Sequence, residues 1–357
     1  MQFRQLRLFQ FKNYLQQEFT FSHKLICITG KNGCGKTTIL DALHFLSFTK
    51  SYFLHQDQLS VSKDKAGMRI DALVEDQQEH ASITCVLREL GKKELLLNNV
   101  PYTRFSEHIG KFPCIFICPD DTQLIMEGSE GRRRFLDMAC SIVHPGYIAA
   151  LNKYNKVLLQ RNSLLKNWNH TSDQHSLLAV YNNQLALFSE PIFAYRKDVC
   201  GVLASYTKLI YNTLSQQSDV IETVYISTLN EQPLEVSLNQ NQDKDIFSQR
   251  SNYGIHKDDW YFAINGMPMK QAASQGQKKS FLFGIKLALF QLIKDRLHKH
   301  AILLLDDFFE KLDEERASCL INYIVSLNTQ VFFTDTHEER VKIAFEKYRN
   351  DVQLIKL

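Results

Sequence analysis

The sequence predicts an α/β fold in which two regions of mixed strands and helices stand before and after an inserted helical region. Three observations lead to this prediction. An apolar strand runs directly into a glycine-rich loop and a helix, helical periods replace strand patterns from residue 120, and strands alternate with helices again after residue 220. We therefore expect three segments along the chain, residues 1–119, 120–220 and 221–357.

The first segment is expected to form sheets around one helix. An apolar stripe at helical spacing, from Thr37 to Phe48, predicts that helix directly after the glycine-rich loop. The other elements are short, rich in β-forming residues and separated by turn signals. They are the expected strands 3–9, 17–21, 24–29, 67–74, 81–87, 94–97 and 114–118.

Helical periods dominate the second segment, and strand signals return in the third. The two longest helices of the second segment could pack as a hairpin, but they lack the many heptads of an extended coiled coil. The polar tract Asn239–Asp245 carries no period, which predicts a loop. The expected helices are 129–138, 145–168, 174–214, 277–297, 314–326 and 338–348, and the expected later strands are 221–227, 260–264, 301–305, 330–334 and 352–355.

The composition is that of an ordinary globular protein. Hydrophobic residues make up 44% and charged residues 23% of the chain, and no apolar run approaches the ~20 residues of a membrane span. The start of the chain, from Met1 to Phe9, alternates like a strand and does not resemble a signal peptide, so we expect a cytoplasmic protein without a membrane partner. Eight scattered cysteines are expected to be reduced and mostly buried. A net charge of +3 is too small to establish a nucleic-acid partner by itself.

A phosphate-binding loop is the strongest motif. It fits the P-loop pattern and lies between an apolar strand and a helix start, which is the context that this motif requires. Its glycines let backbone amides turn toward a phosphate, Lys36 can reach the β and γ oxygens, and Thr37 can offer its hydroxyl to Mg²⁺. The residues of the loop are Gly30, Lys31, Asn32, Gly33, Cys34, Gly35, Lys36 and Thr37.

Two acidic residues follow the apolar strand that ends at Leu305. In a nucleotide site, Asp306 would support Mg²⁺ and Asp307 would act as general base on the attacking water. The alternative is an acidic turn after a strand, and the presence of a P-loop in the same chain favours the functional interpretation.

A polar segment, Ser274–Gln277, precedes another expected helix. Its members Ser274, Gln275, Gly276 and Gln277 stand at the helix start, where the Ser274 hydroxyl and the Gly276 amide could donate to a phosphate. An ordinary helix cap is the alternative for this segment taken alone.

The order of these motifs resembles the ABC-type ATPases of the SMC-like class, with Ser274–Gln277 as the signature segment, Leu303–Asp307 as the Walker B strand and Lys311–Asp313 after it. Within that class the chain is similar to the RecF family over nearly its whole length. The resemblance rests on the stretches 11–14, 128–137, 254–259 and 273–278. It implies an ABC-type ATPase head with mixed β-sheet lobes, formed by residues 1–119 and 221–357, plus an inserted helical domain at 120–220.

The resemblance also implies how the protein works. ATP bound by Gly30–Thr38 of one chain would be covered by Ser274–Gln277 of a second chain, in a head-to-tail dimer that clamps DNA. Hydrolysis would depend on Asp307, whose side chain is shorter than that of the glutamate in transporter ATPases. It would therefore be slow, and it would release the clamp. Such proteins serve recombinational repair and replication restart with RecO and RecR partners. The alternative function is the ATPase subunit of a membrane transporter, and a structural DNA tether ranks third.

Several further residues are candidates with two interpretations each. His256, Lys257 and Gln123 have open roles, and His337 is either a γ-phosphate sensor or, as we favour, a helix-start residue. Basic clusters could contact DNA phosphates or be solvated faces, and the arginine cluster could equally brace the helical region against the nucleotide lobe. The clusters are Lys63 with Lys65, Lys92 with Lys93, and Arg132–Arg134.

Overall fold

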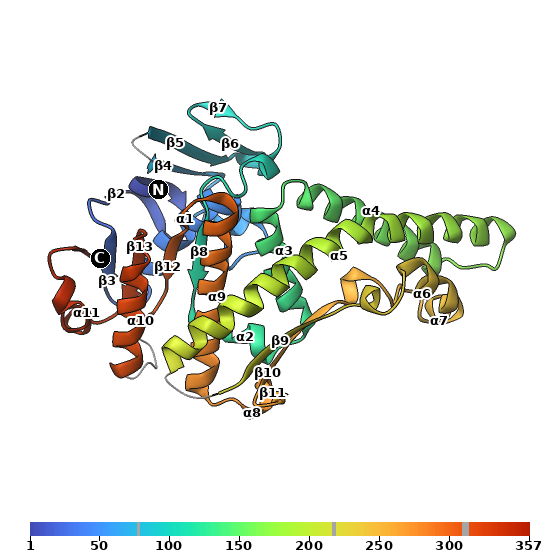
Figure 1. Ribbon diagram of the computed structural model, residues 1–357. Coiled ribbons are helices and arrows are strands. Elements are labelled where there is room, and N and C mark those ends of the chain that lie inside the picture. The colour runs from blue at the N-terminus through green and yellow to red at the C-terminus, as the bar shows by residue number, and fades with distance from the viewer. Residues whose placement is uncertain (77–78, 216–218, 309–313) are drawn as a thin grey trace. The chain divides into compact units, whose positions relative to one another are not determined.

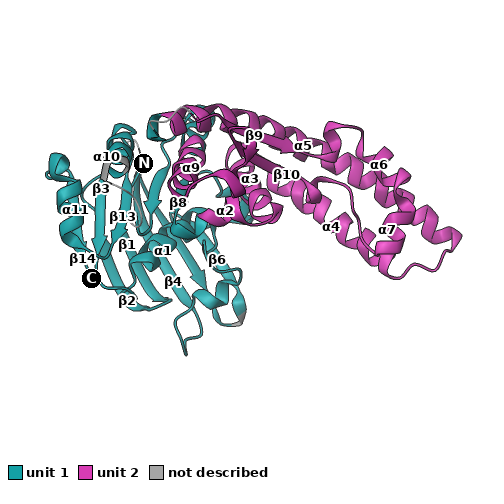
Figure 2. Ribbon diagram, turned by 90° about the horizontal axis from the view of Figure 1, so that it is seen from below, with its two compact units in different colours: residues 1–121, 213–216, 289–357 teal, residues 122–212, 217–288 magenta. Residues whose placement is uncertain are grey.

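The computed structural model describes residues 1–76, 79–215, 219–308 and 314–357. The chain folds into two compact units, which Figure 2 colours separately. Unit 1 consists of Met1–Asp121, Thr213–Gln216 and Leu289–Leu357, and unit 2 consists of Thr122–Asn212 and Gln217–Ala288. Each unit combines segments that are far apart in the sequence.

Unit 1 contains an antiparallel sheet of six strands in the order β2-β1-β4-β5-β6-β7. Apolar and polar residues alternate along β1, which buries Phe3, Leu6 and Leu8 on one face. The strands of this sheet are β1 (Gln2–Phe11), β2 (Tyr14–Thr20), β4 (Met68–Asp76), β5 (Glu79–Leu87), β6 (Lys93–Leu97) and β7 (Val100–Pro101).

A parallel sheet of five strands, in the order β14-β3-β13-β12-β8, forms the second layer of unit 1. Its inner strands are buried along their whole length because both faces are covered, so they read as continuous apolar runs and not as alternating ones. The strands are β3 (Leu25–Thr29), β8 (Cys114–Ile117), β12 (Ile302–Leu305), β13 (Val331–Asp335) and β14 (Val352–Lys356).

Helix α1 (Lys36–Phe48) lies between the two sheets of unit 1 (Figure 1). It contacts β8 and β13 of the parallel sheet and β4 and β5 of the antiparallel one, and nearly every one of its residues is buried. Two further helices, α10 (Glu314–Ser326) and α11 (Glu338–Ala344), alternate with the last strands of the chain. The helix that carries the last residues of the P-loop, Lys36 and Thr37, is therefore packed on two sides.

Unit 2 is mainly helical, with one small sheet in the order β11-β10-β9. Helices α4 (Tyr147–Lys166) and α5 (Ser172–Ser215) run side by side in Figure 1, so they form the hairpin that the sequence suggested. The other elements are α2 (Gln123–Met126), α3 (Ser129–Val143), α6 (Leu234–Gln240), α7 (Gln242–Ser248), α8 (Met269–Ala272), β9 (Ile221–Ile226), β10 (Asp259–Ile264), β11 (Met267–Pro268) and α9 (Gln275–Leu297), whose residues from Leu289 on are counted in unit 1.

The predicted strands and helices are confirmed with shifts at their ends, but one prediction is wrong. The tract Asn239–Asp245 is not a loop, since all of it except Asn241 lies in α6 or α7. Leu234 and Leu238 of α6 are buried, and the side chain of Asp245 in α7 pairs with a distant arginine, a contact that no local period reveals. The helix expected to reach Tyr348 ends at Ala344 and continues as a short 3-10 turn.

All eight cysteines are free thiols, six of them buried, as the sequence predicted. No helix within the described ranges is both long and apolar enough to cross a membrane.

Candidate nucleotide site

The phosphate-binding loop joins two buried elements of unit 1. Strand β3 ends at Thr29, and α1 begins at Lys36, so the loop is anchored at both ends. Gly33 and Gly35 have φ angles of 82° and 107°, in the left-handed region that glycine adopts without a steric cost. Such turns point successive backbone amides into one concave surface that suits an anion.

The turn between β1 and β2 packs on this loop. A Cβ atom at Gly35 would lie 2.6 Å from Asn13 Nδ2 and 2.7 Å from the Tyr14 hydroxyl oxygen, so only glycine fits there. Both side chains donate to the Cys34 carbonyl oxygen at 3.4 Å. Burial, with a smaller contribution from Cys34, raises the pKa of Tyr14 to about 12, which keeps its hydroxyl a donor.

The ammonium group of Lys36 is held inside the loop. Its Nζ donates to the carbonyl oxygens of Gly30 at 2.9 Å and Lys31 at 3.2 Å, and the residue is only 6% exposed. A buried cation beside turned-in amides attracts a negatively charged group. Thr38, two residues after Lys36 in α1, is also buried.

The parallel sheet brings Asp306 to the same place. Strand β12 ends at Leu305, and the Thr37 hydroxyl donates to both carboxylate oxygens of Asp306, at 3.0 and 2.8 Å. Burial, followed by the neighbouring Asp307, raises the pKa of Asp306, while hydrogen bonds from Thr334 and Thr37 oppose that rise. The pair offers a hydroxyl and a carboxylate, which are the oxygen ligands that Mg²⁺ prefers.

Thr334 is a site residue that the sequence analysis did not identify. Its hydroxyl donates to Asp306 Oδ1 at 2.6 Å and accepts the backbone N–H of Asp307 at 2.8 Å. Asp307 has a φ of 44°, so its backbone is fixed in a left-handed conformation. The parallel pairing of Leu305 with Phe333 places residues 306 and 334 at one sheet edge, and this register is what identifies Thr334.

The signature segment lies in unit 2, at the start of α9. Ser274 and Gln277 form a reciprocal cap, in which the Ser274 N–H donates to Gln277 Oε1 at 2.8 Å and the Gln277 N–H donates to Ser274 Oγ at 3.2 Å. Ser274 and Gln275 are exposed, and Gly276 is half-buried. The structure thus brings together Lys36, Thr37, Asp306 and Asp307 within unit 1, and forms the signature as a separate capped turn. The segment Lys311–Asp313 lies outside the described residues.

The two histidine candidates occupy different environments. His256 is packed in unit 2, with Nδ1 2.8 Å from the Tyr154 hydroxyl and Nε2 3.0 Å from the Ser251 carbonyl oxygen, and burial lowers its pKa to about 4. His337 is the N-cap of α11, and its backbone N–H donates to Asp335 Oδ1 at 2.6 Å, which agrees with a helix-start residue. Gln123 is the first residue of the short helix α2.

The arginine cluster is largely used inside unit 2. Arg132 pairs with Asp259 at 2.6 Å, and Arg133 donates to the Asp258 carbonyl oxygen at 2.7 Å. Both partners lie at the start of β10, so Arg132 and Arg133 connect the segment 120–220 to the segment 221–357, as in the bracing alternative, and all four residues belong to unit 2. Arg134, paired with Glu130, keeps a 59% exposed side chain.

Among the four lysines of the two lysine clusters, one is held by contacts within unit 1 and three are exposed. Lys93 is 15% exposed and is held by Asp57 at 2.6 Å and by the Thr49 carbonyl oxygen. Lys92 is 75% exposed, and Lys63 and Lys65 are exposed as well. Three of the four lysines therefore remain accessible as candidates for phosphate contacts.

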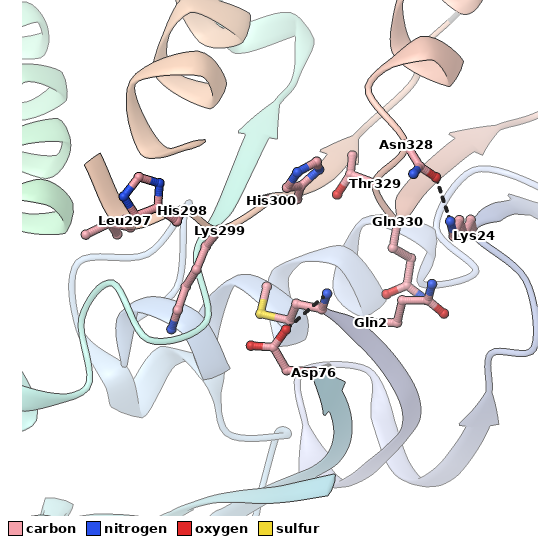
Figure 3. A pocket seen from close by; sticks show the side chains of 11 residues that line it. Gln2, Lys24, Asp76, Leu297, His298, Lys299, His300, Asn328, Thr329 and Gln330 are labelled. Atoms are coloured by element: carbon pink, nitrogen blue, oxygen red, sulfur yellow. Dashed lines mark hydrogen bonds and ion pairs between the residues drawn. The ribbon is translucent and has the colours of Figure 1, made fainter. Parts of the chain in front are cut away.

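A pocket of about 480 Å³ in unit 1 is a different feature from this site (Figure 3). It lies where the parallel strands begin, whereas the P-loop and Asp306 follow the ends of those strands. None of the predicted site residues lines it. Its lining includes Lys24, Asp76, His298, Lys299 and His300.

Comparison with known proteins agrees with the order of these motifs. The family model described as RecF/RecN/SMC N terminal domain matches residues 2–353. The chain is 40% identical over 348 residues to DNA replication and repair protein RecF of Flavobacterium johnsoniae, with 96% of each chain covered.

Solved structures show the same fold. The recombination mediator protein RecF-ATPrS in the RecFOR pathway superimposes with a TM-score of 0.88 at 24% identity, covering 100% of this chain and 96% of that one. The corresponding RecF-ATP structure gives a TM-score of 0.86 at 25% identity, covering 94% and 92%. The fold is therefore the α/β ABC-type ATPase head, and the chain belongs to the RecF family within the wider RecF/RecN/SMC family.

Proposed function

We propose that this chain is a cytoplasmic, ATP-operated DNA clamp that acts in recombinational repair and replication restart. The observation that carries the proposal is the assembly of Lys36, Thr37 and Asp306 around the turned-in P-loop of a RecF-family chain. The relatives are DNA replication and repair proteins, and two structural neighbours hold ATP or ATPrS. No observation favours a transporter subunit.

The residues present fit ATP with Mg²⁺. Gly33 and Gly35 turn amides inward, and Lys36 adds a positive charge where β and γ phosphates would lie. No group of three or more His, Cys, Asp or Glu side chains in the described part of the chain could hold a metal alone. That agrees with Mg²⁺, which is usually held by one or two protein oxygens together with phosphates, here Thr37 and Asp306.

Asp307 is the proposed general base for hydrolysis. Its backbone is fixed by Thr334, so its short side chain has little freedom to follow a water molecule. We expect slow turnover, and slow turnover suits a switch that stays closed until ATP is cleaved.

The second half of the site is proposed to come from another copy of the chain. Ser274–Gln277 of that copy would cover ATP bound at Gly30–Thr38, so that only the triphosphate stabilises the closed dimer. RecO-type and RecR-type proteins are the proposed partners, in keeping with the RecFOR pathway of the structural neighbours.

Sedimentation velocity tests the proposal. The wild type should be monomeric without nucleotide and dimeric with saturating ATP and Mg²⁺. Ser274→Arg should still bind ATP but remain monomeric, whereas Lys36→Ala should lose ATP binding itself. A wild type that stays monomeric with ATP, or a Ser274→Arg variant that dimerises as well as the wild type, would contradict it.

A further inference from the structure

The signature turn is connected to a carboxylate that precedes β9. Gln277 uses its Oε1 atom for the cap on Ser274, and its Nε2 atom donates to Asp219 Oδ2 at 3.0 Å. Both ends of this carboxamide are therefore occupied. The orientation of Gln277, and through it the shape of the cap, depends on where Asp219 lies.

The carboxylate of Asp219 accepts hydrogen bonds from three parts of unit 2. Besides Gln277 of α9, the Tyr211 hydroxyl of α5 donates to Oδ2 at 2.7 Å, and Asn265 Nδ2 in the turn after β10 donates to Oδ1 at 3.1 Å. Burial alone would raise the pKa of Asp219, but these three hydrogen bonds outweigh it and lower the pKa. The group is therefore a charged carboxylate surrounded by donors.

The surroundings fix this carboxylate. The Asn265 N–H donates to the Val220 carbonyl oxygen at 2.8 Å, and the Val220 N–H donates to Asn265 Oδ1 at 2.8 Å, so the residue next to Asp219 is held from both sides. Two turns along α9 from Gln277, Gly284 has no side chain, and a Cβ there would lie 3.4 Å from the Thr207 carbonyl oxygen. The close approach of α9 to α5 brings Gln277 and Tyr211 to one carboxylate.

We propose that Asp219 is a positioning residue of the signature turn, setting the geometry in which Ser274 meets the triphosphate bound by a second chain. This inference rests on the proposed ATP-dependent dimer. Ser274 Oγ accepts the Gln277 N–H, and a hydroxyl that accepts this bond still has its own hydrogen to donate to a phosphate oxygen. When Gln277 is free to rotate, the cap loosens and that donor loses its fixed place.

Asp219→Asn distinguishes this role from simple charge repulsion. Removing a negative charge close to a phosphate site would by itself favour ATP-dependent dimerisation. The positioning role predicts the opposite, because asparagine offers one acceptor oxygen where the carboxylate offers two. Its NH2 group must then face either the Asn265 donor or the Gln277 and Tyr211 donors. The matched control is Glu222→Gln, the same carboxylate-to-amide change at an exposed residue of β9.

Two measurements test the inference. In the monomer without nucleotide, Asp219→Asn should speed hydrogen exchange at the amides of residues 275–278, whereas Glu222→Gln should not. In sedimentation titrations, Asp219→Asn should raise the ATP concentration for half-maximal dimerisation by about tenfold, the usual scale for a lost charge-assisted hydrogen bond, while the affinity of the monomer for a fluorescent ATP analogue stays unchanged.

The outcomes separate the two proposals. A wild type that does not dimerise with ATP overturns the proposed function, and the exchange data still decide whether Asp219 orders the signature turn. Unchanged exchange in Asp219→Asn overturns the inference, and so does dimerisation equal to or tighter than that of a dimerising wild type. Loss of nucleotide affinity in the monomer would also overturn it, since it would show a general effect on the fold.

Discussion

At the scale of single residues, one hydroxyl group connects the two acidic residues of the nucleotide site. Thr334 is fully buried, donates to Asp306 and accepts from the Asp307 N–H. A hydroxyl is the smallest group that can do both at once. Its position at the end of β13 makes it a support for Asp306 and Asp307.

Thr334→Val should therefore weaken hydrolysis more than ATP binding. Valine has nearly the same shape but lacks the hydroxyl that accepts the Asp307 N–H and donates to Asp306, and this loss should cost about 1–3 kcal/mol of stability. Loss of such a supporting contact usually lowers metal-dependent activity by about 10–100-fold. Mg²⁺-dependent ATP hydrolysis and nucleotide affinity, measured on the same preparation, check this prediction.

Thr334→Ser is the matched control, because it keeps the hydroxyl. It should retain most of the activity of the wild type. Equal activity in Thr334→Val and wild type would show that the hydroxyl does not support the site, and equal losses in the valine and serine variants would point to packing of the methyl group instead.

At the scale of elements, α6 and α7 depend on a buried ion pair for their place in unit 2. Arg161 of α4 pairs with Asp245 of α7 at 2.8 Å, and both side chains are 0% exposed. Arg161 also donates to Asn182 of α5, so the pair connects the helical hairpin to the short helices. Formation of such a pair costs free energy, because both charges lose their contact with water. Removal of one partner, however, leaves the other charge buried alone.

Asp245→Ala should therefore destabilise unit 2 by about 3–5 kcal/mol. Urea unfolding gives the free energy, and hydrogen exchange should show faster opening of residues 234–248 in particular. The control is Asp243→Ala, an exposed acid on the same helix, which should change stability by less than about 0.5 kcal/mol. Equal effects of the two substitutions would show that the buried pair does not hold these helices.

The same pair explains which elements could be predicted from the sequence. Strands such as β3 and helices such as α5 carry their own periodicity over enough residues to be recognised. Helix α7 does not, because its residues are mostly polar and Asp245, its buried residue, contacts an arginine 84 positions earlier. Sequence patterns report only the local preference for helix or strand, whereas a tertiary contact stabilises α7.

The residues of the nucleotide site also fall into those that could be identified from the sequence and those that could not. The P-loop, Asp306 and Ser274–Gln277 were identifiable because their chemistry lies in contiguous residues. Thr334 and Asp219 were not, since each acts through hydrogen bonds to residues far away in the chain. Supporting residues of this type need the parallel sheet register or the packing of α9 on α5 before they can be recognised.

At the scale of the whole molecule, the two halves of the proposed site lie in different compact units. The P-loop and Asp306 belong to unit 1, and Ser274–Gln277 belongs to unit 2. In a head-to-tail dimer with twofold symmetry, each ATP would be bound between unit 1 of one chain and unit 2 of the other. Damage to either half then disables both sites of a dimer made of identical chains.

Mixing two inactive variants should therefore restore activity. Lys36→Ala and Ser274→Arg are each expected to lack ATP-dependent association and hydrolysis, but a dimer with one chain of each kind contains one intact site, made of Lys36 from the second variant and Ser274 from the first. Random pairing of equal amounts makes half of the dimers mixed, so hydrolysis should recover to at most about a quarter of the wild-type rate.

A double variant carrying both substitutions, mixed with wild type, is the control. Each site of its mixed dimers has one damaged half, so only the dimers of two wild-type chains can hydrolyse ATP. If the mixture stays as inactive as its components while each variant is folded, the site is completed within one chain and the clamp as proposed here is wrong.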